Sequence, residues 1–261
     1  MKNLIAYKAG HINFEDRGKG QAVVMLHGFL EDLSMWKNLT DDLLDAYRVI
    51  AIDLPGHGST DGFGAVHSME DMAEVVNTVV RALDLNKIIL IGHSMGGYAA
   101  LAYSELFAEN VLGLCLLNST SKPDSEEKKQ NRDRAAEAAL ADPGKFVSML
   151  IPNLFDQNNK NLYRDEINQL IKSASIMTGA NIAAALYGMR DRPDRESVLR
   201  GLGEKAMVVV GLNDPVLDHK SILDQTKSSE IRLVELDGGH MSFIESLEDL
   251  SYFFMRFIEK L

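Results

Sequence analysis

Short apolar runs alternate with segments of helical periodicity along most of this 261-residue chain. The stretch Met69–Leu83 repeats its apolar residues three or four positions apart, which predicts a helix with one buried face. The runs Ala22–Gly28 and Val111–Leu117 are almost continuously apolar, which predicts strands buried on both faces. Strands alternating with helices indicate an α/β fold, in which a mostly parallel central sheet carries helices on both faces. The same pattern predicts further strands from Arg48 onward and at Leu4–Lys8, His11–Glu15, Lys87–Ile91, Lys205–Gly211 and Ile231–Leu236.

The alternation stops between Thr120 and about Ser197, where no run has the character of a strand. Apolar residues recur there at helical spacing, and prolines separate the periodic stretches. We therefore predict a core domain formed by residues 1–119 and 197–261, with residues 120–196 inserted between two strands of its sheet. The predicted helices of the insertion are Asp124–Leu140, Pro143–Leu150, Asn161–Ser173 and Thr178–Met189.

Composition and charge narrow the class of protein. The formal net charge is −11, which repels a polyanion, so we expect no nucleic-acid partner. Cys115 is the only cysteine, which rules out an intrachain disulfide and any cysteine-based zinc site. The N-terminal sequence has no signal-peptide pattern, and no apolar stretch approaches the roughly 20 residues that span a bilayer. We expect a soluble cytoplasmic protein.

The sequence "KIILIGHSMGG" places a serine between glycines where a predicted strand must turn into a helix. Such a turn forces Ser94 into a strained backbone conformation, and Gly92 and Gly96 remove side chains that would clash with it. The hydroxyl then lies at the end of a strand and at a helix N-terminus, where unpaired N–H groups stabilise negative charge. The adjacent His93 is expected to point elsewhere, because neighbouring side chains on a tight turn diverge. Ser94 is the candidate nucleophile.

A serine hydroxyl needs a base, and the base needs a carboxylate that orients it. His240 follows a predicted strand in "ELDGGHMSF", so it lies at the strand ends, within reach of Ser94. Asp214 in "VVVGLNDP" follows the preceding strand and is our choice for the carboxylate. Asp218 and Asp237 are the competitors, but Asp218 has the pattern of a helix N-cap and Asp237 is close to His240 in the chain.

Acyl transfer also needs N–H donors for the oxyanion that develops on the substrate. One donor is the backbone N–H of Met95, the residue after the nucleophile. The second is expected from the loop after an early strand, where "LHGF" turns the chain and directs the backbone N–H of Phe29 inward.

These motifs together resemble the α/β-hydrolase superfamily, in its serine esterase-like branch, over essentially the whole chain. "LHGF", "DLPGHGST", "GHSMGG", "GLNDP" and "GGH" occur in the order and approximate spacing of that family. The resemblance implies that Ser94, Asp214 and His240 follow the family's order of nucleophile, acid and base. It also implies that residues 120–196 form the helical lid found after the sixth strand of this fold.

The resemblance and the residues together predict a serine hydrolase that cleaves a small to medium carboxylic ester through an acyl-enzyme, with no metal or cofactor. Related dehalogenases and epoxide hydrolases use an aspartate where this chain has Ser94. A menaquinone-pathway synthase-like lyase typically has an arginine where this chain has Tyr98. Perhydrolases on the same triad and slow-turnover receptors with this fold remain alternatives. The oligomeric state is left open.

The insertion is expected to supply selectivity for the small-molecule substrate. Ile182, Leu186 and Met189 share a helical face that could line the pocket, with Met149 nearby in sequence. Packing of the insertion on the core explains the same pattern equally well. Arg190 and Arg192 alternate with aspartates, which favours a run of surface ion pairs over an anchor for an anionic substrate.

Overall fold

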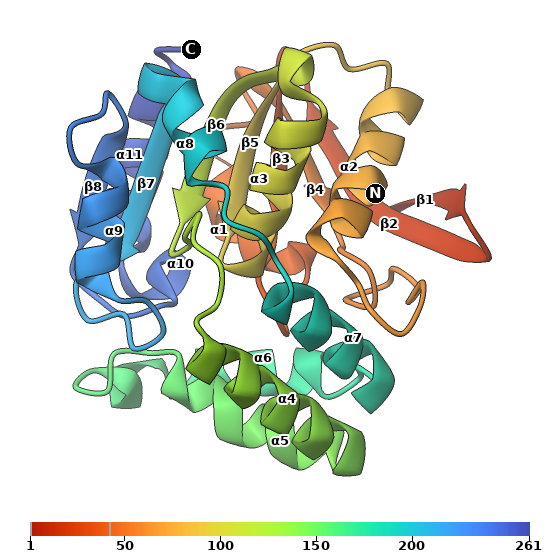
Figure 1. Cartoon of the computed structure of the whole chain (residues 1–261). Helices are drawn as coiled ribbons and strands as arrows, with labels where there is room; N and C mark the ends of the chain where they lie inside the picture. The colour runs from red at the N-terminus through yellow and green to blue at the C-terminus, as the bar shows by residue number, and fades with distance from the viewer. Residues whose placement is uncertain (1, 42) are drawn as a thin grey trace.

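The computed structural model describes residues 2–41 and 43–261, and its centre is one eight-stranded sheet (Figure 1). The strand order is β1-β2-β4-β3-β5-β6-β7-β8. β2 pairs antiparallel with both β1 and β4, and all the other neighbours are parallel. This arrangement confirms the predicted α/β fold class. The strands are β1 (Lys2–Tyr7), β2 (Gly10–Gly18), β3 (Gln21–Leu26), β4 (Tyr47–Ile52), β5 (Ile88–His93), β6 (Val111–Leu117), β7 (Ala206–Gly211) and β8 (Arg232–Leu236).

The central strands are apolar because both faces of the sheet are covered. Every residue of β5 and β7 is buried, so side chains pointing in either direction lie in the core. Helices α2 (Met69–Ala82), α3 (Met95–Leu106), α8 (Glu196–Leu202) and α9 (His219–Thr226) lie on one face, and α1 (Lys37–Thr40) and α11 (Leu247–Ile258) lie on the other (Figure 1). None of the helices in the described residues is long and apolar enough to cross a membrane.

The parallel strands bring residues that are far apart in sequence to one edge of the sheet. Ser94 follows β5, Asn118 follows β6, Asp214 lies just beyond β7, and His240 lies just beyond β8. Neighbouring parallel strands end at the same edge, which is where sites form in sheets of this kind. The strand order alone therefore places these four residues close together at one edge of the sheet.

A helical segment, residues 121–195, separates β6 from α8 and lies beyond this edge of the sheet (Figure 1). It contains α4 (Glu126–Ala141), α5 (Pro143–Leu150), α6 (Arg164–Ala174) and α7 (Gly179–Arg190), which confirms the four predicted helices to within a few residues. The caps explain several boundaries, since the side chains of Ser125, Asp142 and Thr178 each accept a backbone N–H of the helix that follows. α4 packs along α7 through the fully buried Ala136 and Ala139.

Candidate active site

Ser94 occupies the turn between β5 and α3, with backbone angles φ +48° and ψ −112°. A residue other than glycine rarely adopts these backbone angles, so the surrounding structure must hold Ser94 in this conformation. Glycines make the turn possible: a Cβ atom on Gly96 would lie 2.2 Å from the Leu26 carbonyl oxygen, and one on Gly92 would lie 2.4 Å from the Gly96 carbonyl oxygen. The strained turn predicted from the sequence is present.

Ser94, His240 and Asp214 form a continuous chain of hydrogen bonds. The Ser94 Oγ lies 2.9 Å from His240 Nε2, and His240 Nδ1 lies 2.8 Å from Asp214 Oδ2. The two residues considered as competitors of Asp214 lie elsewhere, because Asp218 caps α9 and Asp237 is exposed. The geometry assigns the Nδ1 proton of His240 to its bond with the carboxylate, which leaves Nε2 free to accept the serine proton.

Asp214 is held as a carboxylate by four donors. Its Oδ1 accepts the backbone N–H groups of Val216 and Leu217 at 2.8 and 3.0 Å, and its Oδ2 accepts Asn118 Nδ2 at 2.9 Å in addition to His240. Burial alone would raise the pKa of this carboxyl, but His240 and the hydrogen bonds prevail and lower it. Asp214 is therefore ionised at neutral pH and able to stabilise a protonated His240.

Asn118 is a member of this site that the sequence analysis missed. Its Nδ2 also lies 3.2 Å from the Gly239 carbonyl oxygen, so one amide connects Asp214 to the segment that carries His240. The sequence feature that could have identified Asn118 is its position directly after the buried strand β6, at the same edge of the sheet as the other site residues.

Two backbone N–H groups near Ser94 are unpaired. Met95 begins α3, so its N–H has no acceptor within the helix, and no acceptor is found for it or for the Phe29 N–H among the described residues. The neighbouring Gly28 N–H, by contrast, donates to Glu31 Oε2 at 2.6 Å. The two N–H groups expected to stabilise an oxyanion are thus both available.

His93 and Glu31 form a buried pair behind His240. His93 Nδ1 lies 2.9 Å from Glu31 Oε2, and His93 Nε2 lies 3.0 Å from the backbone carbonyl oxygen of His240. Both partners accept hydrogen bonds, so the arrangement assigns a proton to each ring nitrogen. Burial disfavours the charged ring, but the Glu31 carboxylate more than offsets this and the pKa of His93 is raised. His93 points away from Ser94, as expected, and the pair connects the Gly28 loop to the His240 loop.

This pair predicts a pH-dependent contribution to stability. Because the folded-state pKa of His93 lies above its ordinary value of about 6.5, the contribution is fully present below that pH and is lost as the pH rises through the folded-state pKa. At pH 6, Glu31→Gln is expected to lower the free energy of unfolding by about 3 kcal/mol, and the difference from wild type should shrink towards pH 9. Urea unfolding at several pH values measures it.

The matched control is Asp16→Asn, which breaks the partly exposed ion pair of Asp16 with Arg48 at 2.8 Å. That change is expected to lower the free energy of unfolding by at most about 1 kcal/mol, and the difference from wild type should be the same at pH 6 and at pH 9. A constant difference between Glu31→Gln and wild type across this range would contradict the assignment of charge to the pair.

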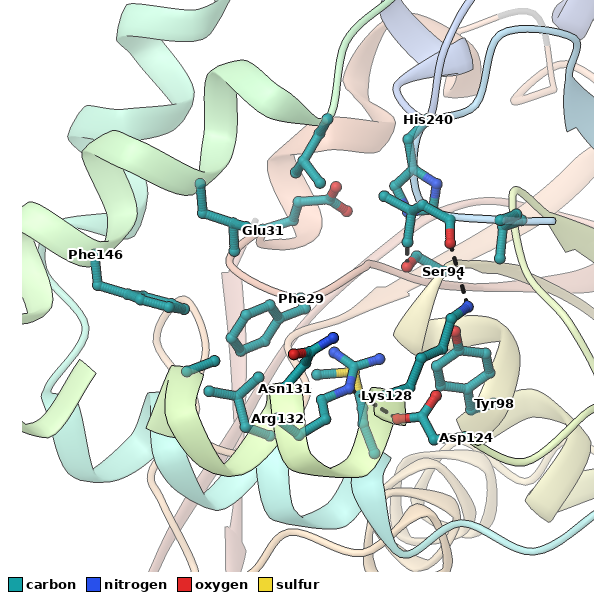
Figure 2. Close-up of a pocket in the computed structure, with 17 residues that line it drawn as sticks. Phe29, Glu31, Ser94, Tyr98, Asp124, Lys128, Asn131, Arg132, Phe146 and His240 are labelled. Carbon is teal, nitrogen blue, oxygen red and sulfur yellow. Dashed lines mark hydrogen bonds and ion pairs between the residues drawn. The ribbon is translucent and has the colours of Figure 1, made fainter. Parts of the chain in front are cut away.

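A cavity of about 340 Å³ lies over Ser94 and His240. Figure 2 shows these two side chains on one side of the cavity and residues of α4 on the other, with Phe29 between them. Much of the wall is apolar, as in sites that bind small organic molecules. The apolar lining residues are Phe29, Ala135, Phe146, Leu150, Leu154, Leu186, Met189, Val216 and Leu217.

The structure corrects part of the predicted pocket lining. Leu186 and Met189 line the cavity, but Met149 and Ile182 do not. Met149 is 63% exposed on the far side of α5, where it lines a separate surface hollow. Ile182 is fully buried in the first half of α7, which packs towards the loop before α2, where the His67 N–H donates to the Ala184 carbonyl oxygen. Only the last turns of α7 reach the cavity.

The two arginines of the predicted run of surface ion pairs are both paired with carboxylates, but the Arg192 side chain is only 5% exposed, so the prediction of a surface pair is wrong for this residue. Arg190 pairs with Asp133 and Asp191, and Arg192 pairs with Asp124. Neither arginine lines the cavity. Among the residues that the structure describes, no group of three or more His, Cys, Asp or Glu side chains could hold a metal ion.

Comparison with known proteins agrees with this geometry. A curated relative, the 2-hydroxy-6-oxononadienedioate/2-hydroxy-6-oxononatrienedioate hydrolase of Escherichia coli, is 29% identical in an alignment that covers 98% of this chain and 93% of the relative. A thermophilic esterase from Thermogutta terrifontis, solved with malate bound, is 30% identical with a TM-score of 0.91, covering 100% of this chain and 98% of the esterase.

A third protein, an esterase from Exiguobacterium antarcticum, has a TM-score of 0.88 over 99% of this chain and 100% of its own. Its 24% identity supports the shared fold alone. The sequence profile of the alpha/beta hydrolase fold matches residues 21–247, which is most of the chain. With the sheet order, the serine turn and this match in agreement, the chain belongs to the α/β-hydrolase family.

Proposed function

We propose that this protein is a serine hydrolase that cleaves small to medium carboxylic esters through an acyl-enzyme. The observation that carries the proposal is the hydrogen-bond chain from Ser94 through His240 to Asp214 at the wall of a largely apolar cavity. This arrangement provides a nucleophile, a base and an orienting carboxylate, and no described residue pairs with the N–H groups that would face the oxyanion.

The proposed reaction has two stages. His240 Nε2 accepts the Ser94 proton as Oγ attacks the ester carbonyl carbon, and the backbone N–H groups of Phe29 and Met95 stabilise the oxyanion. The ester C–O bond then breaks, the alcohol takes the proton from His240, and the acyl group stays on Ser94. A water molecule gives a proton to His240 as its oxygen attacks the acyl carbon. The bond from that carbon to Ser94 Oγ then breaks, Oγ takes the proton back from His240, and the acid is released. Asp214 stabilises the protonated imidazole in both stages.

We further propose that residues 120–196 act as the lid of a core formed by residues 1–119 and 197–261. Residues of α4, α5 and α7 supply much of the cavity wall opposite Ser94. In this proposal the core carries out the chemistry and the lid selects the substrate, since pocket shape affects binding of the whole molecule.

A second candidate function is hydrolysis of a carbon–carbon bond. The E. coli relative is named for a dioate that contains no ester, so its hydrolysis must break a bond between carbons. The same nucleophile, base and cavity could serve either reaction in this chain. The likeness to the esterase, at 30% identity, and the likeness to the E. coli relative, at 29%, are nearly equal, so the choice between the two reactions needs a direct test.

A substrate panel separates the two candidates. Acetate, butyrate and octanoate esters of p-nitrophenol are compared with 2-hydroxy-6-oxononadienedioate, whose conjugated chromophore disappears on cleavage. We expect many turnovers on the shorter esters and a kcat/KM for the dioate at least tenfold lower. A higher kcat/KM for the dioate than for the esters would reject ester cleavage in favour of carbon–carbon bond hydrolysis. A single slow turnover with a persistent adduct would indicate a receptor.

A further inference from the structure

The lid side of the cavity carries cationic side chains. Helix α4 presents Lys128, Asn131, Arg132 and Ala135 to the cavity, at the spacing of one helical face. Figure 2 shows the three polar side chains extending from α4 below Ser94 and Phe29. Lys128 and Asn131 are exposed while also lining the cavity, and Arg132 is partly buried, so this polar face is open both to solvent and to a substrate in the cavity.

Arg132 belongs to a small buried ion network centred on Asp124. Arg132 Nε lies 3.0 Å from Asp124 Oδ2, and Arg192 Nη2 lies 2.8 Å from Asp124 Oδ1. The Asp124 side chain is only 1% exposed. Burial disfavours its charge, but the two guanidinium groups lower its pKa and keep it ionised. Arg192 also stacks over the Tyr98 ring, 4.0 Å from its centroid, which fixes the network against the core.

Lys128 adds a positive charge that no carboxylate in the described chain balances within 4 Å. Its Nζ contacts only the Val216 carbonyl oxygen, at 3.4 Å, which is a long hydrogen bond that leaves other ammonium protons available. Glu31, the other carboxylate of the cavity wall, is already paired with His93. Among the described residues, Asp124 is the single carboxylate paired with any of Lys128, Arg132 and Arg192, in a chain whose net charge is −11.

From this surplus of charge we propose that the cationic face of α4, formed by Lys128, Asn131 and Arg132, binds a carboxylate of the substrate. The inference rests on the proposed ester hydrolysis and specifies its substrate class: esters that carry a free carboxylate in addition to the scissile ester group. Lys128 supplies the unbalanced charge, and Arg132 is held by Asp124 in a fixed position at the wall of the same cavity. The apolar wall accommodates the methylene groups between the two ends of the substrate.

The experiment compares each acid with an amide of the same size. Monoethyl esters of succinic, glutaric and adipic acid carry the carboxylate in the acyl part, and their monoamide ethyl esters are the neutral partners. The second arm uses 4-acetoxybutyrate and 4-acetoxybutyramide, which carry the group in the alcohol part. The measured quantity is the acid-to-amide ratio of kcat/KM. In wild type we expect a ratio above about tenfold in one arm, the range of a hydrogen bond to a charged group.

Lys128→Met is expected to bring this ratio close to one, mainly through a higher KM for the acid. The matched control is Lys129→Met, because Lys129 is the next residue of α4 and pairs with Glu126 outside the cavity. The control should keep the wild-type ratio. Added salt should also lower the ratio in wild type, since ions screen the attraction. Equal rates for acid and amide in both arms, or a ratio unaffected by Lys128→Met, would overturn the inference.

A binding measurement keeps this inference separate from the proposed function. Calorimetry with adipate should give a Kd at least tenfold weaker for Lys128→Met than for wild type, whether or not esters are cleaved. Failure of every ester together with tight, Lys128-dependent adipate binding would reject the esterase proposal and retain the carboxylate site. Ester cleavage without any preference for the acid, and without Lys128-dependent binding, would reject the carboxylate site and retain the esterase proposal.

Discussion

Replacing Ser94 with alanine is expected to abolish ester hydrolysis, with kcat lower by about 10⁶-fold, because the nucleophile of such a triad cannot be replaced by the remaining groups. Folding should be retained, since alanine fits the space of serine and only the hydrogen bond to His240 is lost. We expect the Tm to stay within a few degrees of wild type, because alanine occupies the same strained backbone conformation as Ser94. Steady-state kinetics and thermal unfolding measure the two effects.

A fluorophosphonate probe provides an independent readout of the same residue. Intact-mass analysis of wild type should show one adduct, and peptide mapping should place it on Ser94. The Ser94→Ala variant should remain unlabelled while keeping its thermal transition. Labelling of that variant at another residue, together with retained hydrolysis, would show that a different nucleophile acts.

The second large effect is expected for Asp214→Asn, with kcat lower by about 10⁴-fold. The asparagine oxygen would still accept the N–H groups of Val216 and Leu217, so the amide NH₂ would face His240 Nδ1. That orientation favours the imidazole tautomer with its proton on Nε2, which cannot accept the Ser94 proton. The loss should appear in kcat with the fold intact, as measured by esterase kinetics and circular dichroism.

Asp218→Asn and Asp237→Asn are the controls for this assignment. The Asp218 side chain accepts the Lys220 N–H at the start of α9, a cap that asparagine can also provide. Asp237 is exposed. Both variants should keep kcat within a few-fold of wild type. A larger loss in either control than in Asp214→Asn would move the role of the acid to that residue.

The alternation of strands and helices could be predicted from the sequence because its signals are local. A strand buried on both faces needs a continuous apolar run, as in β5 and β7, and a helix needs apolar residues at a spacing of three or four. The turn around Ser94 could be predicted for the same reason, since the glycines that permit it are neighbours in the chain. The placement of His240 and Asp214 near Ser94 followed from the rule that parallel strands end at one edge.

The bonding partners of Asn118 and the pairing of Glu31 with His93 could not be predicted in this way. Asn118 bonds to Asp214 across 96 positions of sequence, and His93 bonds to the His240 carbonyl oxygen across 147. The sequence around a buried polar residue does not identify its hydrogen-bond partner, because the packing of loops from different strands determines which residues meet. Only the assembled structure shows that His93, next to Ser94, bonds to the backbone of His240.

The sequence by itself determined the α/β fold, the position of the helical insertion and the identity of the three residues proposed for catalysis, because each rests on a local pattern or on strand order. The tertiary structure decided which residues of the helical insertion line the cavity over Ser94. Helix α4 is polar and alanine-rich, so its pattern does not define an inner face, and its packing on α7 through Ala136 and Ala139 turns Lys128 and Arg132 towards the cavity. Met149 is exposed on α5 and Ile182 is buried in α7, because neighbouring helices help to set which side of each helix faces the cavity.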